Sequence, residues 1–259
     1  MAILPRFTSL GHGHTVIMVH DVDGGHLTFA PSVESLASQG YRAIAVDLPG
    51  YGYTPPIEPY NIKALAQSVR ALIDALQVKA VTLVGHGMGA MVALEATMRD
   101  ANLIQRLVLC AGGPPLDDAS VRAWTEPRLA ALEEGLSMPQ VAQRVVSMQT
   151  GQKAIPEGVR LIRHALGEVH PLIYRHALQA MPAFQRNAAA LAQVRVPTLL
   201  LGGAQDACMP PEALQAMAHV LQDASSITLP GIGHWPQLEA PEDFDGLVMD
   251  FLAHGRSIH

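Results

Sequence analysis

The chain has 259 residues and a formal net charge of −6; 49% of its residues are hydrophobic and 15% are charged. This length and composition fit one large α/β domain with an insertion, or two small domains, with a substantial buried core. There is no basic run, which argues against nucleic-acid binding, and no apolar run approaches the ~20 residues that span a bilayer. Cys110 and Cys208 make no disulfide framework, and residues 1–6 lack the apolar core of a signal peptide, so we expect a cytoplasmic protein.

Short apolar runs alternate with helical patterns along most of the chain. The runs expected to be strands are 15–20, 43–47, 81–84, 107–110, 198–201 and 227–229. The segments expected to be helices are 31–39, 62–76, 88–98, 212–221 and 243–253. Continuous apolar strands that alternate with helices indicate a parallel sheet covered on both faces.

The alternation stops between about residues 117 and 193. This segment has the pattern of several helices and contains no convincing strand. We interpret it as a helical cap, residues 117–193, inserted after the sixth strand of a core formed by residues 1–116 and 194–259.

Residues 81–90, VTLVGHGMGA, have the pattern of a strand that enters a sharp turn and then a helix. This is the pattern of a G-x-S-x-G nucleophile elbow, except that Gly87 takes the place of the serine. The central residue of such an elbow has a strained positive φ, which costs a non-glycine residue roughly 1–3 kcal/mol and glycine little. Taken alone, the pattern also fits an ordinary glycine-rich turn.

Two later residues, Asp206 and His234, are candidates for the acid and the base that accompany a nucleophile elbow. Each follows an expected strand, so each lies at the carboxyl edge of the sheet, where α/β sites form. With a nucleophile elbow, the acid and then the base follow in chain order. Asp206 alone also fits a turn or helix cap, and His234 alone fits an exposed loop. The order Gly87, Asp206, His234 at three strand ends favours a catalytic set.

An oxyanion hole needs two backbone N–H groups directed at one point. The candidates are those of Met88, after the elbow, and Val22, in the loop after the first expected strand. Asp21 precedes Val22, and a carboxylate beside the hole would disfavour a developing oxyanion. Asp21 either faces the hole or points into a neighbouring turn, where Asp is common.

Three further segments carry a family resemblance. Residues 20–25 resemble an H-G-x-x-G oxyanion loop, residues 47–52 match D-x-x-G-x-G, and residues 231–242 resemble a catalytic-histidine loop with the helix after it. With the elbow, they make nearly the whole chain similar to the α/β-hydrolase-fold family, including carboxylesterases, enol-lactonases and carbon–carbon bond hydrolases. The resemblance implies an α/β fold with a mostly parallel sheet of about eight strands, helices on both faces and a helical cap. Gly87 for serine and Asp21 for glycine are departures from the family pattern.

The resemblance also implies a hydrolase that acts on a small, mainly apolar ester, lactone or C–C substrate by a Ser-His-Asp mechanism, here with Gly87 at the nucleophile position. The glycine is either an engineered knockout or native. A native-glycine enzyme could use the His234–Asp206 pair to activate water or to abstract a proton, like a lyase or cofactor-free oxygenase. A third alternative is a non-catalytic ligand-binding protein. Serine at position 87 is expected to give cleavage of activated esters.

The substrate pocket is expected between the cap and the sheet edge, lined by His26, His86, Trp124 and Trp235. There is no cofactor motif, and the His12 and His14 pair lacks a carboxylate or thiol that would complete a metal site. We therefore expect no cofactor and no metal. The expected partner is a small-molecule substrate, with no nucleic acid and no membrane, and self-association into a homo-oligomer is left open.

Overall fold

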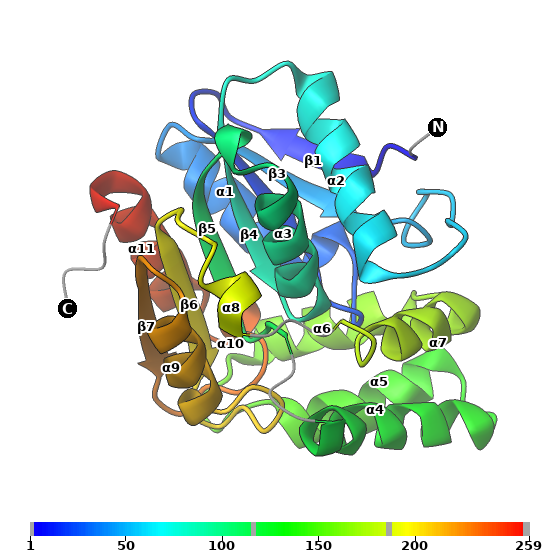
Figure 1. Ribbon diagram of the computed structural model, residues 1–259. Coiled ribbons are helices and arrows are strands. Elements are labelled where there is room, and N and C mark those ends of the chain that lie inside the picture. The colour runs from blue at the N-terminus through cyan, green and yellow to red at the C-terminus, as the bar shows by residue number, and fades with distance from the viewer. Residues whose placement is uncertain (1–2, 115–117, 185–187, 256–259) are drawn as a thin grey trace.

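The computed structural model describes residues 3–114, 118–184 and 188–255. The described residues form one seven-stranded sheet in the order β1-β3-β2-β4-β5-β6-β7 (Figure 1). Every neighbouring pair is parallel except β1 and β3, which are antiparallel. The strands are β1 (Arg6–Leu10), β2 (Thr15–Val19), β3 (Arg42–Asp47), β4 (Val81–His86), β5 (Ile104–Cys110), β6 (Thr198–Gly203) and β7 (Ala224–Leu229).

Helices cover both faces of this sheet, and they pack into two separate hydrophobic cores. Alternate residues of a strand point to opposite faces, so Ile17 and Val19 of β2 belong to one core, and Val16 and Met18 to the other. The core that holds Ile17 is closed by α2 (Ile62–Leu76), α3 (Met88–Arg99) and α9 (Pro211–Val220). The opposite core is closed by α1 (Ala30–Ser38) and α11 (Pro241–His254) and includes Phe29 of the short η1 (His26–Phe29). Two further short helices, η2 (Ala101–Leu103) and α10 (Pro236–Glu239), pack Leu103 and Leu238 against the first core.

The sequence explains the longest of these core helices. In α2, leucine, valine and isoleucine recur at helical spacing, and they are buried against the sheet. Asn61 caps its first turn, because its side-chain oxygen accepts a hydrogen bond from the Ala64 N–H. The helix ends at Gln77, whose left-handed conformation has φ 52°.

All helices between β5 and β6 lie together beyond the carboxyl edge of the sheet, except the short α8 beside the strands (Figure 1). They are α4 (Asp118–Glu133), α5 (Met138–Gln149), α6 (Pro156–Gly167), α7 (Pro171–Ala180) and α8 (Ala188–Leu191). The described part of the segment expected as a cap is thus helical. The boundary expected at 116/117 falls outside the described residues, and the one at 193/194 falls between α8 and β6.

Two strand counts need correction. The sheet has seven described strands where about eight were expected, and the helical insertion follows the fifth strand, β5, where the sixth was expected. Six apolar runs were visible in the sequence, and the figure of eight came from the resemblance. The seventh strand, β1, was missed because all five of its residues are exposed, so its hydropathy does not have the pattern of a buried strand.

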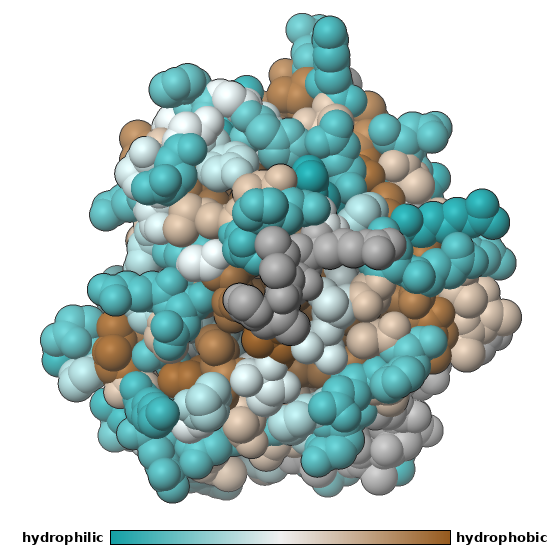
Figure 2. All heavy atoms as spheres, turned by 90° about the vertical axis from the view of Figure 1, so that its left-hand side faces the viewer, coloured by the Kyte–Doolittle hydropathy of each residue, from teal (hydrophilic) through white to brown (hydrophobic). Residues whose placement is uncertain are grey.

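The hydrophobic residues are mostly inside. On the side of the molecule that holds β7 and α11, Figure 2 shows an exterior that is largely hydrophilic, with hydrophobic residues gathered below the middle of the view. None of the helices in the described part of the chain is both long enough and apolar enough to cross a membrane.

Candidate active site

The turn between β4 and α3 has the geometry of a nucleophile elbow. Gly87 lies at its tip with φ 54° and ψ −116°, in the region that favours glycine. Its N–H donates to the carbonyl of Cys110 at 3.0 Å, which ties the elbow to the end of β5. A side chain on Gly85 or Gly89 would collide with neighbouring backbone atoms, so both flanking glycines are required by close packing.

The carboxylate of Asp21 occupies the space that a side chain at position 87 would need. A Cβ placed on Gly87 would overlap the Asp21 carboxyl group. Asp21 Oδ1 accepts a hydrogen bond from the Met88 N–H at 2.6 Å, and Asp21 Oδ2 lies 3.2 Å from His234 Nε2. The Met88 N–H, expected as an oxyanion donor, is therefore engaged by a carboxylate of the chain itself. Asp21 faces the hole and not a neighbouring turn.

His234 lies between two carboxylates. Its Nδ1 is 3.0 Å from Asp206 Oδ2, and its Nε2 faces Asp21. The other oxygen of Asp206 accepts from the N–H groups of Cys208 and Met209 at 2.8 and 3.2 Å. These bonds fix the acid, so the structure brings the three expected strand ends together and adds Asp21 as a fourth group.

This arrangement sets the charges of the site. Burial alone would lower the pKa of His234, but the carboxylates of Asp206 and Asp21 outweigh it and raise the pKa to about 10. Burial opposes ionisation of both carboxyls, yet the hydrogen bond and charge of His234 hold the pKa of Asp21 and that of Asp206 below their usual range. At neutral pH the site is therefore an imidazolium between two carboxylates.

A buried histidine and a buried glutamate hold the loop that carries His234. His86 Nδ1 accepts from the side-chain amide of Gln237 at 3.1 Å, so its Nε2–H donates to the His234 carbonyl at 2.7 Å. Burial lowers the pKa of His86 to about 4, so this histidine is neutral. Glu239 accepts from the N–H groups of Gly151, Gly233 and Trp235 at 2.7–3.0 Å, which also ties the loop to the cap.

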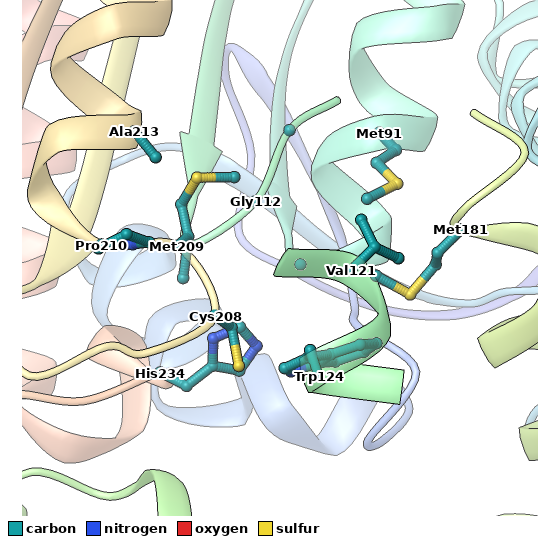
Figure 3. Close-up of a pocket in the computed structure, with 13 residues that line it drawn as sticks. Met91, Gly112, Val121, Trp124, Met181, Cys208, Met209, Pro210, Ala213 and His234 are labelled. Carbon is teal, nitrogen blue, oxygen red and sulfur yellow. The ribbon is translucent and has the colours of Figure 1, made fainter. Parts of the chain in front are cut away.

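A largely apolar pocket opens beside Gly87 and His234. Figure 3 shows His234 and Trp124 near each other at one end, with methionine side chains on both sides of the pocket. Its walls come from α3, α4, the loop after β5, the loop after β6 and the start of α9. The side chains that make the walls apolar are Met91, Val121, Met181, Met209 and Ala213.

Of the four residues expected to line this pocket, the structure places one there, Trp124. His86 is fully buried behind His234, and Trp235 is also fully buried and packs edge-on against the His234 ring. His26 lies elsewhere, with its Nδ1 2.9 Å from Asp47. Proximity in the sequence to the elbow or the catalytic loop suggested these three residues, but their side chains turn toward the core or toward Asp47.

The second oxyanion donor, the Val22 N–H, stays a prediction. Val22 is fully buried, and its carbonyl accepts from the Tyr51 hydroxyl at 3.1 Å, so its loop is fixed. His20, two residues before Val22, also holds this loop: its Nε2 accepts from the Leu48 N–H at 3.0 Å, and its Nδ1–H donates to the Asp21 carbonyl at 2.7 Å.

No pattern in the sequence indicated the buried network that joins the cap to the Asp21 loop. Arg128 on α4 lies 3.0 Å from Asp23 Oδ2, and the Tyr174 hydroxyl on α7 donates to Asp23 Oδ1 at 2.7 Å. All three side chains are buried. The guanidinium of Arg128 also stacks on the Trp124 ring, 4.0 Å from its centroid. Residues more than 100 positions apart meet here, so spacing along the chain could not reveal the network.

Trp124 leaves one polar atom unused. Its side chain is only 7% exposed, and its indole N–H has no hydrogen-bond partner among the described residues. A buried donor without a partner is costly, and a ligand atom can remove that cost. Since Trp124 lines the pocket and its ring centroid is 6.2 Å from that of His234, this donor belongs to the site.

Two sets of potential metal ligands occur in the described ranges, and both include His234. They are Asp21, His86 and His234, and Asp206, Cys208 and His234. His86 has both ring nitrogens in hydrogen bonds with protein groups, and His234 contacts a carboxylate through each of its nitrogens. These bonds account for the clustering without an ion.

The fold and site together define an α/β-hydrolase architecture. The model of the alpha/beta hydrolase family matches residues 12–246, so the chain belongs to that family. It is 26% identical to 2-hydroxy-6-oxononadienedioate/2-hydroxy-6-oxononatrienedioate hydrolase 2 of Pseudomonas putida, covering 96% of this chain and 91% of the relative. It is 27% identical to epoxide hydrolase 2 of Caenorhabditis elegans, covering 93% and 74%.

Solved structures share the same fold. The enol-lactonase from Burkholderia xenovorans LB400 superposes with a TM-score of 0.85 at 22% identity, covering 96% of each chain. A thermophilic esterase from Thermogutta terrifontis superposes with a TM-score of 0.85 at 24% identity, covering 96% of this chain and 93% of the esterase. The named relatives are a 2-hydroxy-6-oxononadienedioate/2-hydroxy-6-oxononatrienedioate hydrolase and an epoxide hydrolase, and the solved structures with this fold include an enol-lactonase and an esterase.

Proposed function

We propose that this protein hydrolyses a small, mainly apolar ester, lactone or C–C substrate without a serine acyl-enzyme. The observation that carries this proposal is the position of His234, which is held by Asp206 and opens onto an apolar pocket. A catalytic histidine oriented by a buried carboxylate is the part of the machinery that survives without serine.

We also infer that Gly87 is the native residue. The Asp21 carboxylate and a side chain at position 87 cannot occupy the same space. If a native serine at position 87 had been replaced by design, the native protein would have had a serine side chain that collides with the Asp21 carboxylate. Asp21 and Gly87 are therefore best explained as one joint change from the family pattern.

In this reaction His234 must lose its proton before it can activate water. Because the pKa of His234 is about 10, only a small fraction is neutral at pH 7. The rate of direct water attack is then expected to rise with pH toward 10. The apolar wall selects an apolar substrate, since burying apolar surface stabilises the complex by about 25 cal/mol per Å².

The test uses p-nitrophenyl butyrate, a short enol-lactone and a vinylogous 1,5-diketone with the purified protein. Turnover of at least one is expected, with a loss on the order of 10²–10⁴-fold in His234→Gln. The control is His219→Gln, because His219 is exposed on α9 and its ring hydrogen-bonds a carbonyl of its own helix. A fluorophosphonate should leave the protein unlabelled.

Labelling by the fluorophosphonate at any serine needed for turnover would overturn the serine-free mechanism. Saturable binding of these compounds without turnover would overturn the hydrolase and support a ligand-binding protein.

A further inference from the structure

We propose that the indole N–H of Trp124 binds the carbonyl oxygen of the substrate and stabilises the negative charge that forms on it when water attacks. This inference rests on the hydrolysis proposed above and names what the pocket recognises, which is an uncharged carbonyl group on an otherwise apolar compound. The oxyanion donor is thereby supplied by α4 of the cap and not by the elbow.

The two backbone donors expected near the elbow are not available to a compound in the pocket. Neither Met88 nor Val22 is among the residues that line it, and both are fully buried. The Met88 N–H already donates to Asp21 Oδ1 at 2.6 Å. A charged carboxylate there would repel a second negative charge at the same donor. A carbonyl oxygen that gains charge therefore needs a donor elsewhere.

Trp124 supplies such a donor. Its side chain lines the pocket, and its N–H has no hydrogen-bond partner among the described residues. The Trp124 ring centroid lies 6.2 Å from that of His234, and Figure 3 shows both side chains at the same end of the pocket. Because the N–H is buried without a partner, its bond to a substrate oxygen is not offset by the loss of another bond. A carbonyl bound there keeps its carbon close to His234.

Arg128 holds this donor in place. Its guanidinium carbon lies 4.0 Å from the centroid of the Trp124 ring, and its Nη1 donates to the Trp124 carbonyl at 3.0 Å. Asp23 fixes the guanidinium from the other side through a 3.0 Å contact. A cation over the ring attracts the π electrons, which increases the partial positive charge of the N–H. Arg128 is thus a positioning residue for the donor.

The other lining residues define the class of substrate. Among the described residues of the lining, His234 is the one cation, and the two carboxylates beside it outweigh its charge. Cys208 Sγ accepts from Gln149 Nε2 at 3.1 Å, and burial raises the pKa of this thiol, so it stays neutral. A carboxylate on the substrate would lose its hydration without gaining a counter-charge. The pocket therefore selects uncharged esters, lactones and ketones.

The atoms and electrons of the reaction balance, as an ester shows. The oxygen of water bonds to the carbonyl carbon, neutral His234 accepts one proton of that water, and the π electron pair moves to the oxygen held by Trp124. The pair then returns, the bond to the alcohol oxygen breaks, and His234 gives its proton to that oxygen. The products are a carboxylic acid and an alcohol, and the indole keeps its proton throughout.

The first test measures binding and does not require turnover. The chain has two tryptophans, so its ¹H–¹⁵N spectrum has two indole resonances, and Trp124→Phe identifies that of Trp124. Saturation with 2-heptanone should move this resonance downfield, because a hydrogen bond deshields the proton. The control ligand, 2-methyl-1-heptene, has a CH₂ group in place of the oxygen and should not. Methyl resonances of Met91 and Met181 on the pocket walls report whether each compound is bound.

The second test removes the N–H and keeps the ring. With 3-benzothienylalanine at position 124, sulfur replaces the N–H, and kcat for p-nitrophenyl butyrate should fall on the order of 10²-fold with little change in KM. The matched control is 7-azatryptophan at the same position, which retains the N–H and should retain kcat. A merely structural role of Trp124 would affect both proteins alike. Circular dichroism confirms that each is folded.

Each remaining outcome decides between the proposals. Equal shifts with ketone and alkene, or no binding of the ketone, would overturn the donor. Turnover that depends on His234 and is unchanged by 3-benzothienylalanine would also overturn it and leave the hydrolase standing. A ketone-specific shift without turnover of any substrate would overturn the hydrolase and the catalytic role of Trp124, and would leave a carbonyl-binding pocket. Absence of both shift and turnover would overturn both proposals.

Discussion

The Asp21 carboxylate occupies the space that a side chain at position 87 would need, and this is possible because residue 87 is a glycine. Asp21 thereby contacts both the Met88 N–H and His234 Nε2. In an elbow with serine, the same space would hold the hydroxymethyl group. The departures at positions 21 and 87, which are separate in the sequence, are thus one structural change.

This relationship revises the expectation that serine at position 87 is sufficient for esterase activity. We predict that Gly87→Ser alone gives no gain, because its side chain collides with Asp21. Backbone strain at φ 54° adds a cost of about 1–3 kcal/mol in the free energy of unfolding. The double variant Asp21→Gly/Gly87→Ser should hydrolyse p-nitrophenyl butyrate and react with a fluorophosphonate.

Urea denaturation and covalent labelling check both halves of this prediction. Asp21→Gly alone is the matched control, since it frees the space without adding a hydroxyl. Esterase activity in Gly87→Ser equal to that of the double variant would show that Asp21 does not block the elbow.

Removing one carboxylate should release the proton of His234 at lower pH. We predict that Asp21→Asn moves the pKa of His234 from about 10 toward its ordinary 6.5, with Asp206 still raising it. The imidazole resonances in an NMR titration report this shift. Asp250→Asn serves as control because Asp250 pairs with the exposed His254, remote from the site in sequence and on α11. An unchanged His234 titration in Asp21→Asn would contradict the ion triad.

Particular residues show how far the sequence could predict this molecule. Apolar strands such as Thr15–Val19 and the order of Gly87, Asp206 and His234 predicted the parallel sheet and the strand ends that meet. Hydrophobic periodicity and the order of the elements depend on the path of the backbone, so they predict which strand ends lie close together. The strand Arg6–Leu10 lacked that signal, because its side chains are exposed.

The directions in which the side chains of the site point could not be predicted from the sequence. Asp21 was visible as an anomaly, but a loop residue has no periodicity that fixes whether it faces a turn or the site. His26 and His86 were suggested by their neighbours and point elsewhere. The contact between Arg128 and Asp23 joins a cap helix to a loop after β2, and no local pattern encodes such a distant pairing.

The ionisable groups of the site should also make the free energy of unfolding depend on pH. The pKa of His234 is raised in the folded chain, so its contribution is complete below about 6.5 and is lost as pH rises through about 10. The pKa values of Asp21 and Asp206 are depressed, so their contribution is present above about 3.8 and is lost as pH falls below it. The loss of the His234 proton between about pH 6.5 and 10, the alkaline limb of the stability curve, lowers the free energy of unfolding by at most about 5 kcal/mol.

Urea denaturation across pH 3–11 measures these limbs. His234→Gln should flatten the decline between pH 7 and 10, since it removes the group whose proton is lost. A decline that remains as steep in His234→Gln as in the unaltered protein would assign the alkaline limb to other groups.

The last prediction concerns the buried ion pair that ties the cap to the Asp21 loop. Arg128→Met leaves Asp23 buried and charged with only the Tyr174 hydroxyl, and should cost about 3–5 kcal/mol of unfolding free energy. The double variant Asp23→Asn/Arg128→Met should be less destabilised than the two single changes together, because neither charge is then left alone. Urea denaturation of all four proteins completes the cycle.

A second ion pair of the cap provides the control for that cycle. Arg144 and Glu134 pair at 2.8 Å, but their side chains are 42% and 51% exposed, so solvent screens them. Arg144→Met should therefore leave the free energy of unfolding nearly unchanged. An equal cost for Arg128→Met and Arg144→Met would mean that burial does not strengthen the Arg128–Asp23 contact. The loop that carries Asp21 would then have to be held by its other bonds, from His20 and Tyr51.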